Sequence, residues 1–504
     1  MNPISYPPMN HPLRRGYSSC AVGLFAAGIT AFVAATTMIA QTAPGSIPAP
    51  RDEVVQLSVF EVSATKPNRY QAAEATSGGR VRTDIFNSPQ TINVVTEELI
   101  KDVGANRILD ALKYIPGVTE STIPNGLDRV TVRGFQIDGR TVDGFYSISQ
   151  ANLDPATISR IEVVKGPNAI LSPAGSPGGT LNAVSKKPLF TQQTSLTVRA
   201  GLFDDSGIEL DSTGPAGGPD AKAAYRVVGA YRNADNYYDG TETVSHLFAP
   251  SVTYRFSRDT QLTLQGEFSN WRTINYLGIP LDPASGSTNT AVLLSGVPEK
   301  IALYNSDVYR KDELQEIRAL FTSRLTDNLS TRVAARYSEW NQDTTQLTFS
   351  PQGGNQGGAR DPLTGLWTPG LVYGPGPTFT PSPAPVQSRI FTQGGSDQIM
   401  HEKFLNFQND WVYQRTFDKL ESTTAAGFAY SKNLPKGNSD LTIEPISNSP
   451  FNIDAVVLQN ATKAGTLSAR QRNTAHNSQV YVNQIISAFE GRVNLSAGVS
   501  HVAF

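Results

Sequence analysis

The chain has 504 residues, a length that permits about three ordinary domains. Its 42 lysine and arginine residues nearly balance 44 aspartate and glutamate residues, and the net charge of −2 argues against a nucleic-acid-binding protein, which needs a basic surface. Outside residues 20–40 there is no long apolar run, which excludes a bundle of transmembrane helices. The mean hydropathy of −0.26 does not exclude a membrane β-barrel, because barrel strands alternate lipid-facing with lumen-facing residues.

The first forty residues have the order of a secretory signal peptide. Arg14 and Arg15 precede an uncharged stretch, rich in Ala, Gly and Thr, that runs from Cys20 to Ala40. Basic, then apolar, then small residues predict a cleaved signal over residues 1–40. An N-terminal membrane anchor is the alternative, because about 20 residues can span a bilayer. Cys20 is the only cysteine, so the cleaved chain would have no disulfide and no cysteine-ligated metal.

Residues 41–78 are rich in Pro, Ser and Ala and contain one apolar island at residues 54–62. The island has strand-forming residues but no neighbouring segment with which to pair. We therefore predict a flexible tether that carries an extended recognition strand, which a partner captures by adding it to a sheet. An ordinary first strand of the next domain is the alternative.

Residues 79–190 are predicted to form a small mixed α/β domain. Short apolar stretches separated by Gly, Pro and Asn predict four strands, at 91–95, 130–133, 161–164 and 180–184. Thr96 and Asn106 are candidate N-caps of two helices, because short polar side chains accept hydrogen bonds from the first N–H groups of a helix. Asp154 followed by Pro155 predicts the start of another short helix.

From residue 191 onward, apolar and polar residues alternate with a period of two. Eleven such stretches predict strands, at 195–202, 206–212, 223–232, 244–257, 260–269, 314–325, 329–340, 401–416, 421–431, 478–488 and 492–502. About ten residues is the length that a tilted strand needs to cross a bilayer, whereas strands of soluble proteins average about 5–6 residues. Short turns alternate with long loops, at 270–313, 341–400 and 432–477. We therefore predict an antiparallel transmembrane β-barrel over residues 191–504.

Five motifs in residues 79–190 resemble the plug domain of TonB-dependent outer-membrane receptors. In chain order they are SPQTINVVT (88–96), ALKYIPGV (111–118), VRGF (132–135), IEVVKGP (161–167) and AGSPGGTLN (174–182). The last motif is similar to that of siderophore receptors of the ferrichrome type. The family usually has Arg where Lys165 stands and Tyr-Gly where Ser172 and Pro173 stand. The resemblance implies an α+β plug domain followed by an antiparallel transmembrane β-barrel.

The resemblance also implies a function, which is active import of a ferric siderophore or a similarly scarce ligand across the outer membrane. The ligand would bind between the extracellular loops and the plug. TonB, with its inner-membrane motor proteins, would then grasp the tether over residues 41–78 from the periplasm. The best candidate for this TonB box consists of Val59, Phe60, Glu61, Val62, Ser63 and Ala64.

Four single residues receive roles from the same resemblance. Arg133 and Arg160 flank plug strands and would pair with barrel carboxylates to hold the plug, or they are solvated charges at strand edges. Gln136 and Tyr146 lie in the region where related receptors present ligand contacts, or they are ordinary loop-tip residues. The resemblance implies no cofactor and no resident metal.

Other functions are less well supported by the sequence. The chain has no G-x-S-x-G, H-E-x-x-H, C-x-x-C or Walker A motif, and its five histidines do not have metal-ligand spacing, so we do not predict an enzyme. A glycan or other nutrient receptor of the same family remains an alternative. A passive porin or adhesin barrel is a further alternative, although a diffusion pore has no need of a plug.

The number of predicted strands conflicts with a complete plugged barrel. Plugged transporters of this kind have about 22 strands, and bacterial single-chain barrels have even numbers. Residues 191–504 supply about eleven, which would leave no room for a plug of residues 79–190. We therefore expect a truncated receptor, which lacks about half of its barrel and presents an unpaired sheet edge. A truncated receptor that is non-functional alone is an alternative to a working transporter.

Overall fold

The computed structural model describes residues 59–61, 69–122, 128–137, 140–147, 152–166, 176–218, 221–235, 237–238, 240–274, 300, 309–351, 390–434, 441–452, 469–471, 476–489 and 491–503. Within these residues no helix is long and apolar enough to cross a membrane. They form a plug region followed by one large antiparallel sheet, and both belong to one compact unit of the chain.

The plug region is built on a five-stranded sheet with the order β3-β9-β10-β7-β8. Its strands are β3 (Thr91–Thr96), β7 (Arg140–Val142), β8 (Phe145–Ser147), β9 (Ile158–Lys165) and β10 (Gly179–Ser185). β7 and β10 are parallel, and the other pairs are antiparallel. A second sheet joins β4 (Val118–Thr122), β5 (Asp128–Val132) and β6 (Phe135–Ile137). The four predicted plug strands are thus confirmed within a few residues.

Three short helical segments cover the plug sheet, namely α2 (Glu97–Asp102), α3 (Ile108–Leu112) and the 3₁₀ turn η1 (Pro155–Thr157). Thr96 caps α2 as predicted, and Asp154 caps η1 by accepting the Ala156 N–H at 2.9 Å. The predicted cap of α3 is wrong, because Asp110 in its first turn accepts the backbone N–H of Asn106 instead. The Asp110 carboxylate binds the N–H groups of Asn106 and Arg107, which precede the helix, and the Asn106 side chain instead accepts a hydrogen bond from Arg199.

Apolar side chains from both plug sheets and both α-helices form one dry core. Its most buried members are Val95, Leu109, Ala111, Leu112, Val132, Ile158, Ile161, Val163 and Ala183. A short pair, β1 (Glu74–Ala75) with β2 (Thr83–Asp84), spans the predicted domain boundary at residue 78. The last residues of the predicted tether therefore pack with the plug.

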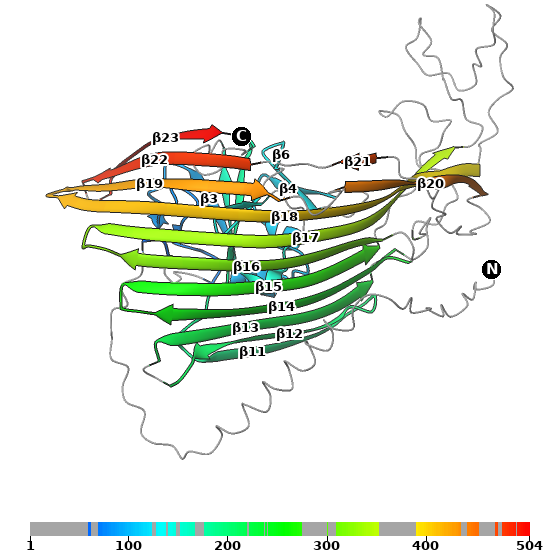
Figure 1. Cartoon of the computed structure of the whole chain (residues 1–504), viewed down its shortest axis with the longest axis horizontal. Coiled ribbons are helices and arrows are strands. Elements are labelled where there is room, and N and C mark those ends of the chain that lie inside the picture. Colours follow the sequence, from blue (N-terminus) through cyan, green and yellow to red (C-terminus); the bar gives the residue numbers. More distant parts are fainter. Residues whose placement is uncertain are drawn as a thin grey trace, which may run out of the picture. The chain divides into compact units, whose positions relative to one another are not determined.

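Eleven strands follow one another in chain order across the described part of the large sheet, as Figure 1 shows. They are β11 (Gln193–Ala200), β12 (Ser206–Pro215), β13 (Ala223–Asp235), β14 (Glu242–Arg255), β15 (Thr260–Ile274), β16 (Arg310–Arg324), β17 (Leu329–Pro351), β18 (Ile390–Phe417), β19 (Leu420–Asn433), β22 (His476–Ala488) and β23 (Val493–Ala503). Every neighbouring pair is antiparallel. All eleven predicted strands are confirmed, and the antiparallel meander with short turns is the predicted architecture.

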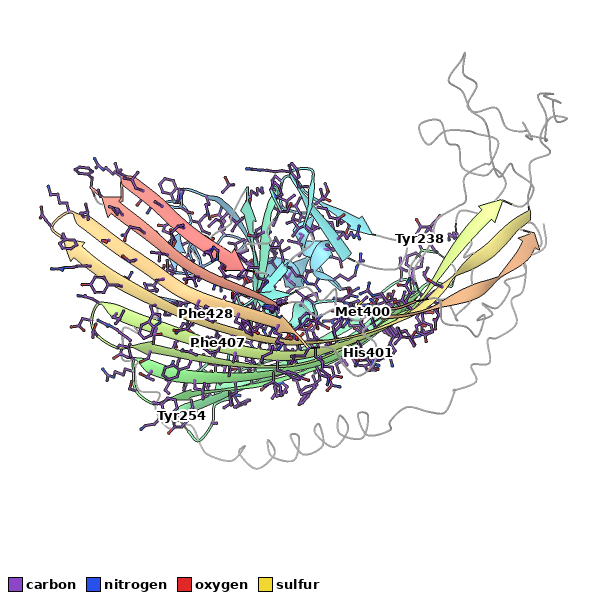
Figure 2. The ribbon with its side chains drawn as sticks, turned by 45° about the horizontal axis from the view of Figure 1, so that its top comes forward. Tyr238, Tyr254, Met400, His401, Phe407 and Phe428 are labelled. Atoms are coloured by element: carbon purple, nitrogen blue, oxygen red, sulfur yellow. The ribbon has the colours of Figure 1, made fainter. Side chains whose placement is uncertain are left out.

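The two faces of the large sheet differ as the period of two predicts. On the outer face, apolar side chains such as Val198 (71% exposed) and Val499 (70%) are open. Aromatic side chains share this face, and Figure 2 labels Tyr254, Phe407 and Phe428 among them. The inner face carries buried polar side chains and meets the plug. This pattern is that of a sheet with lipid on one side and a polar lumen on the other.

Two strands reach far into a predicted loop, and two were missed. β17 reaches Pro351 and β18 begins at Ile390, inside the predicted loop of residues 341–400. β20 (Leu441–Asn452) pairs with the first part of β18, and β21 (Ala469–Gln471) pairs with β20, both inside the predicted loop of residues 432–477. β20 has Pro445 and Pro450, which are compatible with an edge strand but hide the strand from a propensity argument.

Candidate functional site

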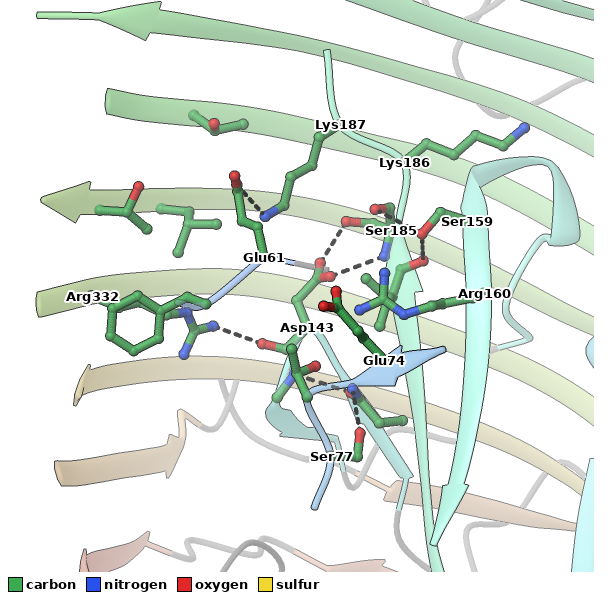
Figure 3. A pocket seen from close by; sticks show the side chains of 18 of the residues that line it. Glu61, Glu74, Ser77, Asp143, Ser159, Arg160, Ser185, Lys186, Lys187 and Arg332 are labelled. Carbon is green, nitrogen blue, oxygen red and sulfur yellow. Dashed lines mark hydrogen bonds and ion pairs between the residues drawn. The ribbon is translucent and has the colours of Figure 1, made fainter. Parts of the chain in front are cut away.

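A cavity of about 460 Å³ lies between the plug and the inner face of the large sheet. Figure 3 shows it from close by. Its wall includes Phe60 and Glu61 from the N-terminal segment, Arg160 from the plug, and Arg255 and Gln261 from the large sheet. Arg255 ends β14 and Gln261 follows Thr260, the first residue of β15, so the cavity lies near the end of the sheet where short turns join the strands.

Glu61 connects the N-terminal segment to both sides of this cavity. Lys187 Nζ lies 3.0 Å from Glu61 Oε1, and Gln261 donates a hydrogen bond to the same oxygen at 3.1 Å. The Lys187 ammonium lowers the pKa of Glu61 and outweighs the opposing effect of burial. Glu61 is therefore held as a carboxylate between the plug and β15.

The rest of the N-terminal segment packs against the sheet wall. Val59 and Phe60 contact an apolar cluster that contains Val81 and Tyr481, and the Val59 carbonyl accepts the Arg82 N–H at 2.8 Å. Half of the predicted TonB box is thus docked at the cavity. The other half, Val62, Ser63 and Ala64, lies outside the described residues.

Glu162 in β9 binds the backbone of Thr76 and Ser77 to the plug sheet. Its carboxylate is fully buried and accepts the backbone N–H groups of Thr76 and Ser77 at 3.1 and 2.8 Å. Arg160 Nε lies 2.6 Å from the other oxygen of Glu162. The prediction that Arg160 pairs with a barrel carboxylate is therefore corrected, because its ion-pair partner lies two residues away in the same strand.

The turn between β7 and β8 contacts the large sheet. Asp143 and Gly144 have φ values of 52° and 80°, as a two-residue hairpin turn requires. The Asp143 carboxylate accepts the N–H and O–H of Ser185 at 2.9 and 2.6 Å. Three adjacent strands also bind the turn, through Arg318 (β16) to the carboxylate, Arg332 (β17) to the Asp143 carbonyl, and Gln408 (β18) to the Gly144 carbonyl.

These contacts keep Asp143 ionised. Burial alone would raise the pKa of its carboxyl group, but the Arg318 guanidinium and the two hydrogen bonds from Ser185 together hold the pKa below its ordinary value. The turn is therefore a negatively charged tip inserted among positively charged side chains of the sheet.

Two further ion pairs join the plug to β12 and β13. Asp154, the cap of η1, lies 2.6 Å from Arg232, which also contacts Glu209 at 3.1 Å. Lys186 lies 2.9 Å from Asp211. All four side chains of the closer pairs are at least nine-tenths buried. At Asp143 and Asp154 the plug supplies the carboxylate and the sheet supplies the arginine, the reverse of the predicted polarity.

Comparison with known proteins agrees with this arrangement. The family model for the TonB-dependent Receptor Plug Domain matches residues 84–180. The chain carries the plug of a TonB-dependent receptor. Among curated relatives, the ferripyoverdine receptor of Pseudomonas aeruginosa is 30% identical over 191 residues, which cover 36% of this chain and 23% of that protein. The ferrichrome outer membrane transporter/phage receptor of Escherichia coli (strain K12) is 30% identical over 220 residues, 41% of this chain and 29% of that protein.

Solved structures share the fold of this chain. The structure of P. aeruginosa FpvA bound to heterologous pyoverdines superimposes with a TM-score of 0.66 at 19% identity, and the match covers 86% of this chain and 54% of that chain. The chain thus spans about half of the solved receptor, and its matches span smaller shares of the curated relatives.

At the opposite end of the plug, the chain presents two cations. Arg133 follows β5 with a φ of 51° and is exposed, and Lys165 ends β9 and donates to the Pro116 carbonyl at 2.6 Å. Partial burial and the nearby Arg133 charge both lower the pKa of Lys165. In the described residues Arg133 makes no ion pair with the large sheet, so its predicted role as a plug–barrel contact gains no support.

The two predicted ligand contacts are placed only in part. Gln136 lies in β6, where its side-chain oxygen accepts a hydrogen bond from Arg129 at 3.1 Å. Tyr146 lies in β8 and its backbone pairs with Thr141, while its side chain is outside the described residues. Both roles remain predictions. Sequence reasoning missed Asp143, although Asp143 followed by Gly144 carries the Asp-Gly hairpin signal between two strands.

Proposed function

We propose that this receptor imports a ferric siderophore, or a ligand of comparable size and scarcity, across the outer membrane in a TonB-dependent cycle. The carrying observation is that buried ion pairs join the plug to the large sheet, and two of their members, Asp143 and Lys186, line the cavity, whereas the interior of the plug is apolar. Separating a buried ion pair returns both charges to water, which offsets much of the lost attraction, so the plug can leave the wall without losing its core. The N-terminal segment docked at the cavity supplies the point on which TonB and its inner-membrane motor proteins pull.

The names of the relatives support the ligand class, because they denote receptors for ferripyoverdine and ferrichrome. The plug end with Arg133 and Lys165 offers two cationic groups, which suits an anionic ferric chelate. We assign Gln136 and Tyr146, near this end, as candidate ligand contacts. A signal peptide over residues 1–40 and a location in the outer membrane belong to the same proposal.

Uptake of a radioactive ferric siderophore tests the proposal in cells that lack their own siderophore receptors. We expect uptake in cells that express the chain within a complete barrel and none in cells with an empty vector. Deletion of residues 59–64 should abolish uptake while binding of the siderophore at the cell surface persists. Uptake that survives both this deletion and collapse of the proton gradient would identify a passive pore and overturn the proposal.

A glycan ligand is distinguished by regulation and by growth. Induction of the chain by iron starvation, together with growth on a ferric chelate as the iron source, supports a siderophore. Induction by an oligosaccharide, with growth on that sugar and no iron phenotype, would move the assignment to a glycan receptor of the same family.

A further inference from the structure

Three neighbouring strands of the large sheet place Asp410, Gly427 and Tyr481 directly across from one another. Asp410 of β18 pairs with Gly427 of β19, and Gly427 pairs with Tyr481 of β22. Because glycine has no side chain, the two outer residues meet over it, and the Tyr481 hydroxyl donates to Asp410 Oδ1 at 2.7 Å. Both Asp410 and Tyr481 are 1% exposed. The inner face therefore carries a recess with an aromatic wall and a carboxylate.

The recess depends on the missing side chain of Gly427. A Cβ atom there would lie 2.5 Å from Tyr481 Cε1, 2.7 Å from Asp410 Oδ1 and 2.8 Å from the Asn409 carbonyl oxygen. The Tyr481 ring and the Asp410 carboxylate could make room only by moving apart. The Asn409 oxygen belongs to the backbone and cannot swing aside. Any larger residue at 427 would thus separate the carboxylate from the ring.

Arg80 of the N-terminal part of the plug occupies this recess. Its Cζ lies 4.8 Å from the centroid of the Tyr481 ring, Nη1 lies 3.4 Å from Asp410 Oδ1, and Nη2 donates to Gln479 Oε1 at 3.2 Å. A ring face, a carboxylate and an amide oxygen are the groups that recognise a planar, delocalised cation. The set is thus complementary to a guanidinium group.

The same patch of the wall also holds the start of the described chain. Val81 and Tyr481 belong to the cluster against which Val59 and Phe60 pack, and the Arg82 N–H binds the Val59 carbonyl. Whatever releases Arg80 from the recess would also loosen the backbone that carries Val59. Here the plug supplies the cation and the sheet the anion, the opposite of the contacts at Asp143 and Asp154.

We propose that Asp410, Gly427 and Tyr481 form a guanidinium-binding socket, and that Arg80 in this socket retains the segment of residues 59–61 on the wall. The chemical class of its occupant is a guanidinium or a comparable planar cation. In the resting chain the occupant is Arg80, a positioning residue that acts on Val59 through Val81 and Arg82. The inference concerns binding within the chain and stands apart from the identity of the imported ligand.

The test uses the full chain in outer-membrane vesicles, with Cys20→Ala and Val59→Cys as a reporter. We expect Arg80→Ala to raise the rate at which a polar maleimide labels position 59 by about tenfold, the scale of one cation–π and ion-pair contact. In the parent chain, millimolar ethylguanidinium should raise labelling, because it competes with Arg80 for the socket but is not joined to the backbone that holds Val59. Sodium chloride at the same ionic strength should not, because it only screens charge.

Four further variants separate the socket from a general loosening of the fold. Arg82→Ala is the matched control, since its side chain lies 3.8 Å from Glu74 and is no part of the socket, and labelling should stay unchanged. Tyr481→Leu should raise labelling as Arg80→Ala does, and ethylguanidinium should then have no further effect, because the ring is gone. Gly427→Ala should behave like Tyr481→Leu, and Arg80→Lys should be intermediate.

Two results would overturn the proposal. One is unchanged labelling in Arg80→Ala, and the other is an equal rise in labelling of the parent chain with ethylguanidinium and with sodium chloride. The assay needs neither TonB nor a siderophore, so its failure would leave the proposed import untouched. Conversely, a chain that retains a working socket but imports nothing would refute only the proposed function.

Discussion

The interior of the plug and the surface that joins it to the large sheet are built on different physical principles. The interior is a cluster of fully buried Val, Leu, Ile and Ala side chains from two sheets and two helices. The joining surface is mostly polar, with Asp143, Asp154, Lys186 and Glu61 each meeting an oppositely charged or amide side chain. The first kind of contact is strong and non-directional, whereas the second depends on a few exact pairings.

This difference indicates which parts separate first under force or denaturant. When the plug leaves the wall, water replaces the partners of the paired charges. The cavity between the plug and the sheet already leaves room for water there. Unfolding the plug exposes its apolar core, which costs far more. We therefore expect undocking before unfolding.

The largest expected effect is in the plug core. Leu109 is 1% exposed, and Leu109→Ala should lower the free energy of unfolding of the plug by about 3 kcal/mol, because it leaves a cavity among packed side chains. Hydrogen exchange of the β9 and β10 amides measures the change. Leu202→Ala is the matched control, since Leu202 is 82% exposed and the same truncation should have almost no effect. Equal losses in both variants would contradict a distinct core.

A charge at the joining surface should affect docking and spare the core. Asp154→Asn keeps the shape of the η1 cap but removes the charge that meets Arg232, so docking should weaken by about 1–3 kcal/mol. A cysteine at Ala156, which is buried against Val228 and Leu247 of the sheet, reports undocking through the urea concentration at which it is labelled.

Asp102→Asn is the control for this charge change, because its side chain is 32% exposed. Labelling should begin at lower urea in Asp154→Asn only, while exchange at β9 stays as in the parent. If β9 amides lose protection in parallel with the label, docking and core folding are one event and the comparison fails.

The pH dependence of docking should be small in the neutral range. Because contacts in the docked plug lower the pKa of Asp143, its contribution is fully present above the ordinary carboxyl pKa of about 4 and is lost as pH falls through the lowered value. The urea concentration at which Ala156→Cys is labelled should therefore be constant between about pH 5 and 8 and fall in stronger acid. In Asp143→Asn the acid-induced fall in this urea concentration should be smaller. A change near pH 6 in the parent would instead implicate another titrating group.

Sequence reasoning located the framework because the framework is repetitive. Alternation with a period of two gave all eleven strands of the meander, and the Thr96 and Asp154 caps followed from local chemistry. The pairings across the cavity could not be predicted in this way. Arg160 meets Glu162 in its own strand, while Asp143 meets Arg318, 175 residues later. Such partners depend on register and on the depth at which the plug sits, and neither quantity leaves a periodic signal in the sequence.

The smallest expected effect is at the solvent-facing side of the plug, where Arg69 lies 2.6 Å from Asp102. The Arg69 side chain is 62% exposed, so water screens the pair and Arg69→Ala should change stability by about 0.5 kcal/mol or less. That small change should vanish when sodium chloride is raised, because an exposed pair is screened within a Debye length. The Asp154–Arg232 pair is buried, so its contribution to docking should persist in the same salt series. Equal salt sensitivity of the two pairs, measured by urea-dependent labelling, would show that water reaches the joining surface as freely as the exterior and would remove the distinction between them.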